Sequence, residues 1–257
     1  MSAPYPHRRR YASDDPSTAD LATSWEASAA GFIAWARKPL HDSYWRYHRD
    51  QFLELVPPPG RLTLDIGCGE GRLSRDLKAR GHTVIGLDAS PTMIEHARAA
   101  DAEIEAYVGD AAALPFEDGV ADLAVAFMSL QDIDDLAGAV AELGRVLEPS
   151  GRLCLAIVHP LNSAGVFADE GETSPFVIAG SYLERSRYVD TIERDGLAVT
   201  FVSEHRPLEV YFEALAAAGF LIERLREPRV PETAVTEPRS RRWQRVPLFL
   251  HIRAIRS

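Results

Sequence analysis

The residues best suited to chemistry in this sequence lie in one short glycine-rich stretch and just after the apolar segment that follows it. The stretch reads Asp65-Ile-Gly-Cys-Gly-Glu-Gly71. Glycines let a backbone bend sharply and let a ligand lie against it, and a turn that opens a helix offers free N–H groups. Two carboxylates frame this turn, Asp65 before it and Asp88 beyond it. The first suits an ammonium group, and the second can accept both hydroxyls of a ribose.

The spacing of the glycines separates this turn from the dinucleotide-binding fingerprint, G-x-G-x-x-G. Here the third glycine comes one residue earlier, and Asp65 would be an awkward neighbour for a pyrophosphate. The two acidic positions together describe a ligand with an amino-acid end and a nucleoside end, which is S-adenosylmethionine. An NAD(P)-dependent oxidoreductase is therefore a distant alternative.

Further motifs follow the glycine turn in order and at compatible spacing. They are Gly86-Leu-Asp88-Ala-Ser90, Gly109-Asp110-Ala111 with Leu114-Pro-Phe116, and Leu147-Glu-Pro-Ser-Gly-Arg-Leu153. With the glycine turn as motif I, they resemble the acidic loop, the adenine-side motif and the turn before strand five of class I S-adenosylmethionine-dependent methyltransferases. Within that superfamily, the pattern is most similar to the small-molecule branch that resembles enzymes of ubiquinone and menaquinone biosynthesis. The resemblance is good over about residues 40–160 and moderate over the last 50 residues.

The resemblance implies a cofactor site with residues from several elements. Asp65 would face the amino-acid end of the cofactor, Asp88 its ribose, and Asp110 its adenine. The implied cofactor-binding residues are Tyr44, Asp65, Gly67, Cys68, Gly69, Arg72, Asp88, Ala89, Met93, Asp110, Ala111, Phe127, Met128 and Ser129. Tyr47 is an alternative to Tyr44 for the tyrosine that an N-terminal helix offers to the cofactor carboxylate. Packing of these aromatic residues on the sheet is the plainer interpretation.

Hydrophobic periodicity predicts the elements that must position these residues. The predicted strands are 62–66, 83–87, 104–108, 123–127, 153–158, 220–225 and 247–255, and the predicted helices include 21–38, 42–55 and 71–80. The resemblance implies an α/β fold, a Rossmann-like, doubly wound, seven-stranded sheet whose last strand lies antiparallel beside strand five. We expect a flexible tail over residues 1–20 and a single domain over 21–257, with an N-terminal helical cap over 21–58.

Residues 160–206 are predicted to form a substrate lid inserted after strand five. Tyr188–Arg194 and Leu197–Phe201 flank Asp195-Gly196, which is typical of a hairpin with a type I′ turn. In this architecture an insertion at that point sits over the methyl group of the cofactor. A surface decoration is the alternative.

The candidate catalytic residues are His159 and His205. Methyl transfer from a sulfonium is a direct displacement and needs no covalent nucleophile, but a hydroxyl acceptor would benefit from a general base. Histidine titrates near neutral pH, and both residues lie beside predicted rim elements. Rim histidines that only hydrogen-bond a loop are the alternative. Many relatives carry histidine near Gln131 and Asp132, where this sequence has none. We find no spacing typical of metal ligands and predict no metal.

Composition limits the class of protein. The chain has 257 residues, 46% of them hydrophobic, and a net charge of −10. This acidic balance argues against a general nucleic-acid binder, and no apolar run approaches the roughly 18 residues that span a membrane. Arg8-Arg-Arg10 has no apolar stretch behind it, so we expect no secretory signal. Cys68 and Cys154 are the only cysteines, which suggests reduced thiols in the cytoplasm.

The sequence thus predicts a cytoplasmic enzyme that transfers a methyl group from S-adenosylmethionine to a small, hydrophobic metabolite and releases S-adenosylhomocysteine. A non-catalytic module that binds the same cofactor is the second interpretation, and a nucleic-acid methyltransferase ranks low because no large basic face is apparent. The acceptor atom stays open among O, N, C and S, as does the oligomeric state.

Overall fold

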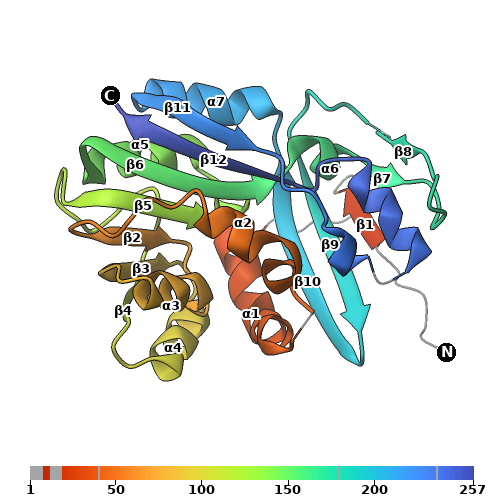
Figure 1. The fold of residues 1–257 in the computed structure, drawn as a ribbon, viewed down its shortest axis with the longest axis horizontal. Helices are drawn as coiled ribbons and strands as arrows, with labels where there is room; N and C mark the ends of the chain where they lie inside the picture. Colours follow the sequence, from red (N-terminus) through yellow and green to blue (C-terminus); the bar gives the residue numbers. More distant parts are fainter. Residues whose placement is uncertain (1–7, 12–18, 40, 179, 236) are drawn as a thin grey trace.

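The computed structural model describes residues 8–11, 19–39, 41–178, 180–235 and 237–257. Figure 1 shows a central twisted sheet with helices on both faces and a long hairpin that extends beyond the sheet beside helix α1. The sheet has seven strands in the order β11-β12-β6-β5-β2-β3-β4. Their bounds are β2 Thr63–Ile66, β3 Val84–Asp88, β4 Glu105–Val108, β5 Ala121–Phe127, β6 Leu147–Val158, β11 Phe220–Arg226 and β12 Phe249–Arg256.

The pairing confirms the predicted sheet. Strands β2 to β6 pair in parallel, and β12 pairs antiparallel with both β6 and β11. The strand order therefore reverses between β2 and β5, where a doubly wound sheet leaves a crevice at the carboxyl ends of its strands. No helix in the described part of the chain is both long enough and apolar enough to cross a membrane.

Helices lie on both faces of this sheet, and further helical turns lie beside the hairpin (Figure 1). Their bounds are α1 Leu21–Arg37, the π-helix η1 Tyr44–His48, α2 Arg49–Leu53, α3 Arg72–Ala79, α4 Pro91–Ala100, the 3-10 turn η2 Leu130–Asp132, α5 Leu136–Val146, α6 Pro160–Ala164, α7 Leu208–Ala217, and the 3-10 turns η3 Glu232–Ala234 and η4 Pro238–Gln244. Helix α4 begins as its sequence predicts, because the Ser90 hydroxyl accepts from the Met93 backbone N–H and Pro91 occupies the first turn.

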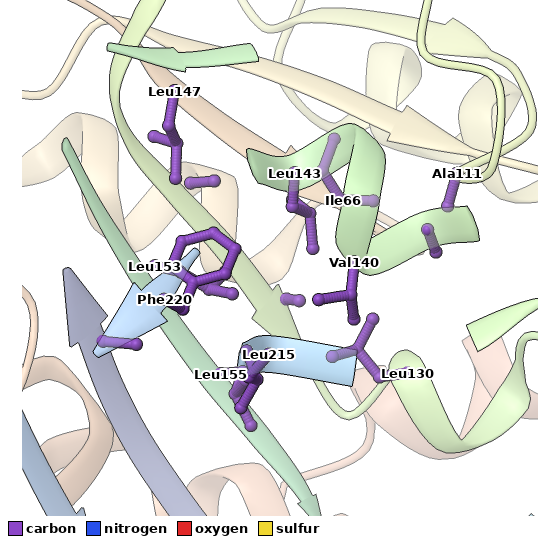
Figure 2. Packing of buried hydrophobic residues seen from close by; sticks show 14 of the residues in the cluster. Ile66, Ala111, Leu130, Val140, Leu143, Leu147, Leu153, Leu155, Leu215 and Phe220 are labelled. Carbon is purple, nitrogen blue, oxygen red and sulfur yellow. The ribbon is translucent and has the colours of Figure 1, made fainter. Parts of the chain in front are cut away.

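The core has two halves because successive residues of β5 point to opposite faces of the sheet. Ala124 and Ala126 belong to the larger half, which α5 and α7 cover; Figure 2 shows Val140, Leu143 and Leu215 of these helices meeting Leu153 and Leu155 of β6. Val125 and Phe127 belong to the other half, with Phe52 and Leu77. Each fully buried leucine or phenylalanine contributes about 1.5–3 kcal/mol, so these clusters hold the strand ends rigidly in place.

Two segments depart from the predicted elements. The expected single helix over 42–55 is instead the π-helix η1 followed by the short α2. The wide turn places the His48 ring against Phe249, with its Nδ1 3.0 Å from Nε2 of His251, so tertiary packing overrides the helical pattern. Within the expected flexible tail, Arg8–Tyr11 forms strand β1 and pairs antiparallel with β9, whose outer edge would otherwise leave backbone groups free. The rest of 1–18 lies outside the described residues.

The hairpin predicted within 160–206 is present and longer than expected. Strands β9 Ser186–Arg194 and β10 Leu197–His205 pair antiparallel throughout. Asp195 and Gly196 have φ values of 49° and 76°, the left-handed pair that a type I′ turn requires. The segment also holds α6 and a small sheet of β7 Val166–Phe167 and β8 Phe176–Val177. Helix α1 packs against β10, so the hairpin and the N-terminal helix form one wall.

Candidate functional site

A cavity of about 860 Å³ opens at the carboxyl ends of the parallel strands. One side is lined by the glycine turn after β2, the end of β3 and the segments after β4 and β5. The other side is lined by α1, the inner face of the β9–β10 hairpin, η4 and the start of β12. Its volume lies within the range of small-molecule and cofactor sites.

Asp65 lies on the side of the cavity that is formed by the glycine turn and the strand ends, which we call the motif side. Its Oδ2 accepts from the Ser74 hydroxyl at 2.6 Å, whereas its Oδ1 is buried with no hydrogen-bond partner among the described residues. Burial raises the pKa of Asp65 to about 7, and the nearby Asp88 adds to this effect while Ser74 and Arg72 oppose it. A buried, unpaired carboxylate oxygen is costly unless a ligand donor satisfies it, and an ammonium group would do so.

The glycine turn keeps space for a ligand. A Cβ on Gly67, at φ +74°, would lie 2.3 Å from the Ser129 Cβ, so the turn can approach that side chain only because it carries no side chain of its own. A Cβ on Gly69, at φ +56°, would meet no protein atom within 4 Å. Gly69 lines the cavity, so its missing side chain leaves an open cradle.

Asp88 is fixed by the same turn. Its Oδ2 accepts from the Gly69 N–H at 2.8 Å, and its Oδ1 accepts from the Ser90 N–H at 2.9 Å. Burial raises the pKa of Asp88, and these two backbone donors act against the rise. The carboxyl group therefore lies in one fixed orientation at the end of β3, with lone pairs left for hydroxyl donors.

The remaining motif residues form the upper part of the same side. Ala89, Met93, Asp110 and Ala111 line the cavity, as do Cys68, Phe127, Met128 and Ser129. Asp110 is turned by its own loop, because its Oδ1 accepts from the Ala112 N–H at 2.9 Å. The backbone of Met128, directly after the end of β5, has a φ of 56°. This left-handed conformation is uncommon for residues other than glycine.

The two candidate tyrosines are separated by the fold. Tyr47 lines the cavity, whereas Tyr44 is fully buried and is not among the described lining residues. The Tyr44 hydroxyl donates to Asp76 Oδ2 at 2.5 Å, and burial raises its pKa. Arg72 does line the cavity, and its guanidinium lies over the Tyr44 ring, 4.7 Å from the centroid, and 2.8 Å from Asp42 Oδ1.

The structure does not bring His159 and His205 to the cavity lining that it describes. His159 Nε2 lies 3.1 Å from Glu227 Oε1, and its Nδ1 accepts from the Leu161 N–H. Burial lowers the pKa of His159, and Glu227 opposes this. His205 joins Ser163 Oγ at 2.6 Å and the Tyr182 carbonyl at 2.9 Å. Both rings hold loops around α6.

The sequence interpretation missed Asp132 as a site residue. Asp132 ends η2, lines the cavity, and has a pKa that burial raises to about 7. Its position directly after strand β5 was the available signal, since open α/β sheets bind ligands at the carboxyl ends of their strands. No group of three or more His, Cys, Asp or Glu side chains arranged to hold a metal ion occurs among the residues that the structure describes.

The opposite side of the cavity comes from segments without motifs. Every second residue of β9 from Tyr188 to Arg194 lines it, which is the inner face of the hairpin. Trp25 and Phe32 of α1 pack edge-to-face against each other and against Phe201 of β10, with ring centroids 5.5–6.2 Å apart. All three rings line the cavity and form an aromatic wall.

Comparisons with known proteins agree with the division of the cavity into a side with sequence motifs and a side without them. Residues 64–155 match a family described as a methyltransferase domain. Malonyl-acyl-carrier-protein O-methyltransferase of Salmonella typhimurium is 37% identical over 130 residues, covering 49% of this chain and 51% of that protein. Demethylmenaquinone methyltransferase of Corynebacterium kroppenstedtii is 33% identical over 112 residues, covering 44% and 47%. The chain thus spans about half the length of these relatives.

Likeness in structure extends much further along the chain than the match in sequence. The crystal structure of an S-adenosylmethionine-dependent methyltransferase from Mesorhizobium loti covers 84% of this chain and 98% of its own, with a TM-score of 0.68 and 26% identity. The region that matches the methyltransferase-domain family, residues 64–155, contains the motif side of the cavity. Helix α1 and the hairpin lie outside it.

Proposed function

We propose that this chain, a class I S-adenosylmethionine-dependent methyltransferase by its fold and its matched domain, transfers a methyl group to a small acceptor held in the same cavity as the cofactor. One observation carries the proposal. A single cavity is lined on one side by the motif residues and on the other by the aromatic wall and the inner face of the hairpin. A two-substrate transfer needs both ligands side by side in this way.

The residues of the motif side fit the proposed cofactor. The unpaired Oδ1 of Asp65 would accept from its ammonium group, and Asp88 from its ribose hydroxyls. The open cradle at Gly69 would let the ligand lie against the backbone, and Asp110 with Ala111 would face the adenine. When bound, the cofactor supplies an activated methyl group on sulfur. The protein's contribution is then to orient both ligands and to exclude water, and orientation alone can contribute about 7–11 kcal/mol.

The charge of the cavity supports a small acceptor that is not strongly anionic. Its described lining contains eleven carboxyl side chains but four arginines and no lysine. Such a lining attracts a cationic cofactor and repels a phosphate backbone, so a nucleic-acid acceptor is disfavoured. The names of the two relatives give different acceptors, malonyl-acyl-carrier protein and demethylmenaquinone. The acceptor of this chain is therefore inferred from the residues on the aromatic side of its cavity.

The first test is calorimetric titration with S-adenosylmethionine, S-adenosylhomocysteine and NAD(H). Micromolar binding of the two sulfur ligands without binding of NAD(H) is the expected result. Binding of NAD(H) alone would overturn the proposal. Binding of the sulfur ligands combined with no turnover on a broad set of acceptors would instead favour a non-catalytic binding module.

We also propose that the protein works in the cytoplasm. Cys68 and Cys154 are both free thiols and both buried. Burial raises the pKa of each thiol, which keeps it protonated and unreactive. Retention of reduced thiols and of full activity in a reducing buffer would support this location.

A further inference from the structure

We propose that Asp132 is the general base of this site and that the acceptor is an aromatic hydroxyl. This inference rests on the methyl transfer proposed above and adds to it the proton acceptor and the chemical class of the acceptor. It is carried by the place of Asp132 in the cavity, by the charges around it and by the aromatic wall beside it.

Asp132 lies where the two sides of the cavity meet. It follows β5 on the motif side, and the side chains of Ser203 on β10 and Trp25 on α1 surround its carboxyl group. Oδ2 accepts from the Gln131 amide at 3.0 Å. The Ser203 hydroxyl and the Trp25 indole also hydrogen-bond to this carboxyl group. An ionised carboxylate has about four acceptor positions, so one is left for a donor that enters the cavity.

The surroundings of Asp132 set its protonation near neutrality. Burial raises its pKa to about 7, while Ser203, Gln131, Trp25 and the Arg206 cation act in the opposite direction. Tyr211 of α7 also faces this group, but burial raises its own pKa to about 12, so it stays neutral.

Among these neighbours Arg206 is not free to neutralise the carboxylate. Its guanidinium donates to the carbonyls of Leu130 and Ile133 and pairs with Glu204. A base with a pKa close to the working pH is partly ionised and still accepts a proton readily.

The chemical step balances with these groups. The acceptor hydroxyl gives its proton to the Asp132 carboxylate while its oxygen forms the new bond to the methyl carbon. The bond between that carbon and sulfur breaks, and its electron pair stays on sulfur, which becomes a neutral thioether. Asp132 then returns its proton to water when the products leave. No oxidant, reductant or metal is needed.

The same position disfavours other acceptor groups. An acceptor carboxylate beside Asp132 would bring two anions together in a poorly hydrated site that already carries a large excess of acidic side chains. An aliphatic amine beside Asp132 would be held as its ammonium ion, whose nitrogen has no lone pair to attack the methyl group. A hydroxyl avoids both problems because it is neutral and donates to the carboxylate.

The aromatic wall narrows the class further. Trp25 contacts Asp132 and packs against Phe32 and Phe201. All three rings line the cavity, and flat rings pack well on such a surface. An aromatic hydroxyl has a pKa of about 10, as in tyrosine, which is close enough to the pKa of Asp132 for proton transfer during the reaction. An aliphatic alcohol is a far weaker acid.

The test uses two probes that share one ring system, 2-naphthol and 2-naphthoate. Each is titrated calorimetrically into the protein loaded with S-adenosylhomocysteine, at pH 7.5. We expect 2-naphthol to bind at least tenfold more tightly than 2-naphthoate. Equal or tighter binding of the naphthoate, or no binding of 2-naphthol, would overturn the proposed acceptor class. Prior binding of S-adenosylhomocysteine separates this outcome from failure of the proposed cofactor site.

The role of Asp132 is tested with Asp132→Asn and with the matched variant Asp118→Asn, an exposed residue outside the described cavity lining. Methyl transfer to 2-naphthol, followed by mass spectrometry, should fall by roughly 10²–10⁴-fold in Asp132→Asn and stay unchanged in Asp118→Asn. S-adenosylhomocysteine affinity should be retained in both, which also shows that the variants fold.

The pH profile provides a second readout. In the unsubstituted protein the rate constant for transfer should rise with pH through about 7, as Asp132 ionises, and then level off. The residual activity of Asp132→Asn should lack this inflection. Full activity of Asp132→Asn, or an unchanged inflection in it, would show that Asp132 is not the base. If Asp132→Asn fails to fold, a rate that is flat between pH 6 and pH 8 in the unsubstituted protein would refute the proposal by itself.

Discussion

Cofactor binding should be coupled to the ionisation of Asp65. Burial raises the pKa of this carboxyl to about 7, so about half of the molecules carry it protonated at neutral pH. An ammonium group at Oδ1 requires the ionised form and would stabilise it. Binding should therefore release a proton at pH 7 and weaken as the pH falls.

The size of the effect follows from the pKa. With a pKa of about 7, roughly half of the carboxyl groups are ionised at pH 7 and roughly 3% at pH 5.5. The affinity for S-adenosylhomocysteine, which has the same amino-acid end as the cofactor, should thus fall roughly fifteenfold between these pH values. At pH 7 about half a proton should be released per ligand bound, provided that the ligand fully ionises Asp65.

Calorimetric titration in two buffers of different ionisation enthalpy measures both quantities. The matched variant is Asp65→Asn, which should bind roughly 10- to 100-fold more weakly at pH 7 because a charged hydrogen bond is lost. It should also lose the part of the pH dependence that belongs to Asp65, leaving only that of Asp88, whose pKa is raised as well. An affinity that is equal at pH 5.5 and 7 in the unsubstituted protein would refute the placement of the ammonium group.

A stability measurement tests whether weaker binding by Asp65→Asn comes from loss of the fold. Because the folded pKa of Asp65 is higher than its unfolded value of 3.8, the native state binds more protons between these pH values, and its stability falls as the pH rises through this window. Asparagine removes this penalty. Asp65→Asn should therefore melt no lower than the unsubstituted protein at pH 7, and a much lower melting temperature would mean that Asp65 holds the fold together.

Further predictions concern stability and the glycine turn. Burial lowers the pKa of His251 to about 3 from 6.5, so its neutral form stabilises the fold above pH 6.5 and this stability is lost as the pH falls. From pH 7 to pH 5, the unfolding free energy measured by urea denaturation should fall by about 2 kcal/mol less in His251→Gln than in the unsubstituted protein. An equal fall in both proteins would contradict this prediction. Gly69→Ala should weaken cofactor binding at a stability cost of about 1–2 kcal/mol, whereas Gly67→Ala should cost more because its Cβ meets Ser129; equal melting temperatures of the two would count against this. Arg206→Met should lower the unfolding free energy by about 3–5 kcal/mol, because it unpairs a buried ionic network, and a loss below 1 kcal/mol would argue against that role.

The motif side of the cavity was accessible to sequence reasoning because backbone geometry dictates it. Positive φ values at positions 67, 69 and 71 restrict the turn almost to glycine, and the buried strand that precedes it carries apolar Leu64 and Ile66 on either side of Asp65. These local constraints leave a signature of fixed spacing. The seven-stranded sheet and its antiparallel last strand are accordingly confirmed, and residues 64–155 match the methyltransferase-domain family.

The acceptor side could not be predicted in the same way. His159 and His205 were chosen because they are histidines near strand ends, but side-chain direction at those positions depends on α6 and the loops around it. The π-helix η1 likewise turns Tyr44 toward Asp76 and leaves Tyr47 at the cavity. A shift of one residue in the register of a helix or strand changes which side chains face the cavity. Hydrophobic periodicity does not predict register to within one residue.

The inner face of the hairpin illustrates why acceptor specificity and cofactor binding can change independently. Residues of β9 alternate between the two faces of the hairpin, so Asp190 and Ile192 line the cavity whereas Val189 and Thr191 do not belong to its described lining. Substitutions at the inward positions alter the acceptor wall without touching the β2–α3 turn, because the hairpin belongs to a separate sheet. Asp132 is different, since it follows a strand of the central sheet and faces the hairpin. A base at the junction of the central sheet and the hairpin can act with many different hairpin sequences, provided that each positions a neutral hydroxyl of the acceptor at the same carboxyl group.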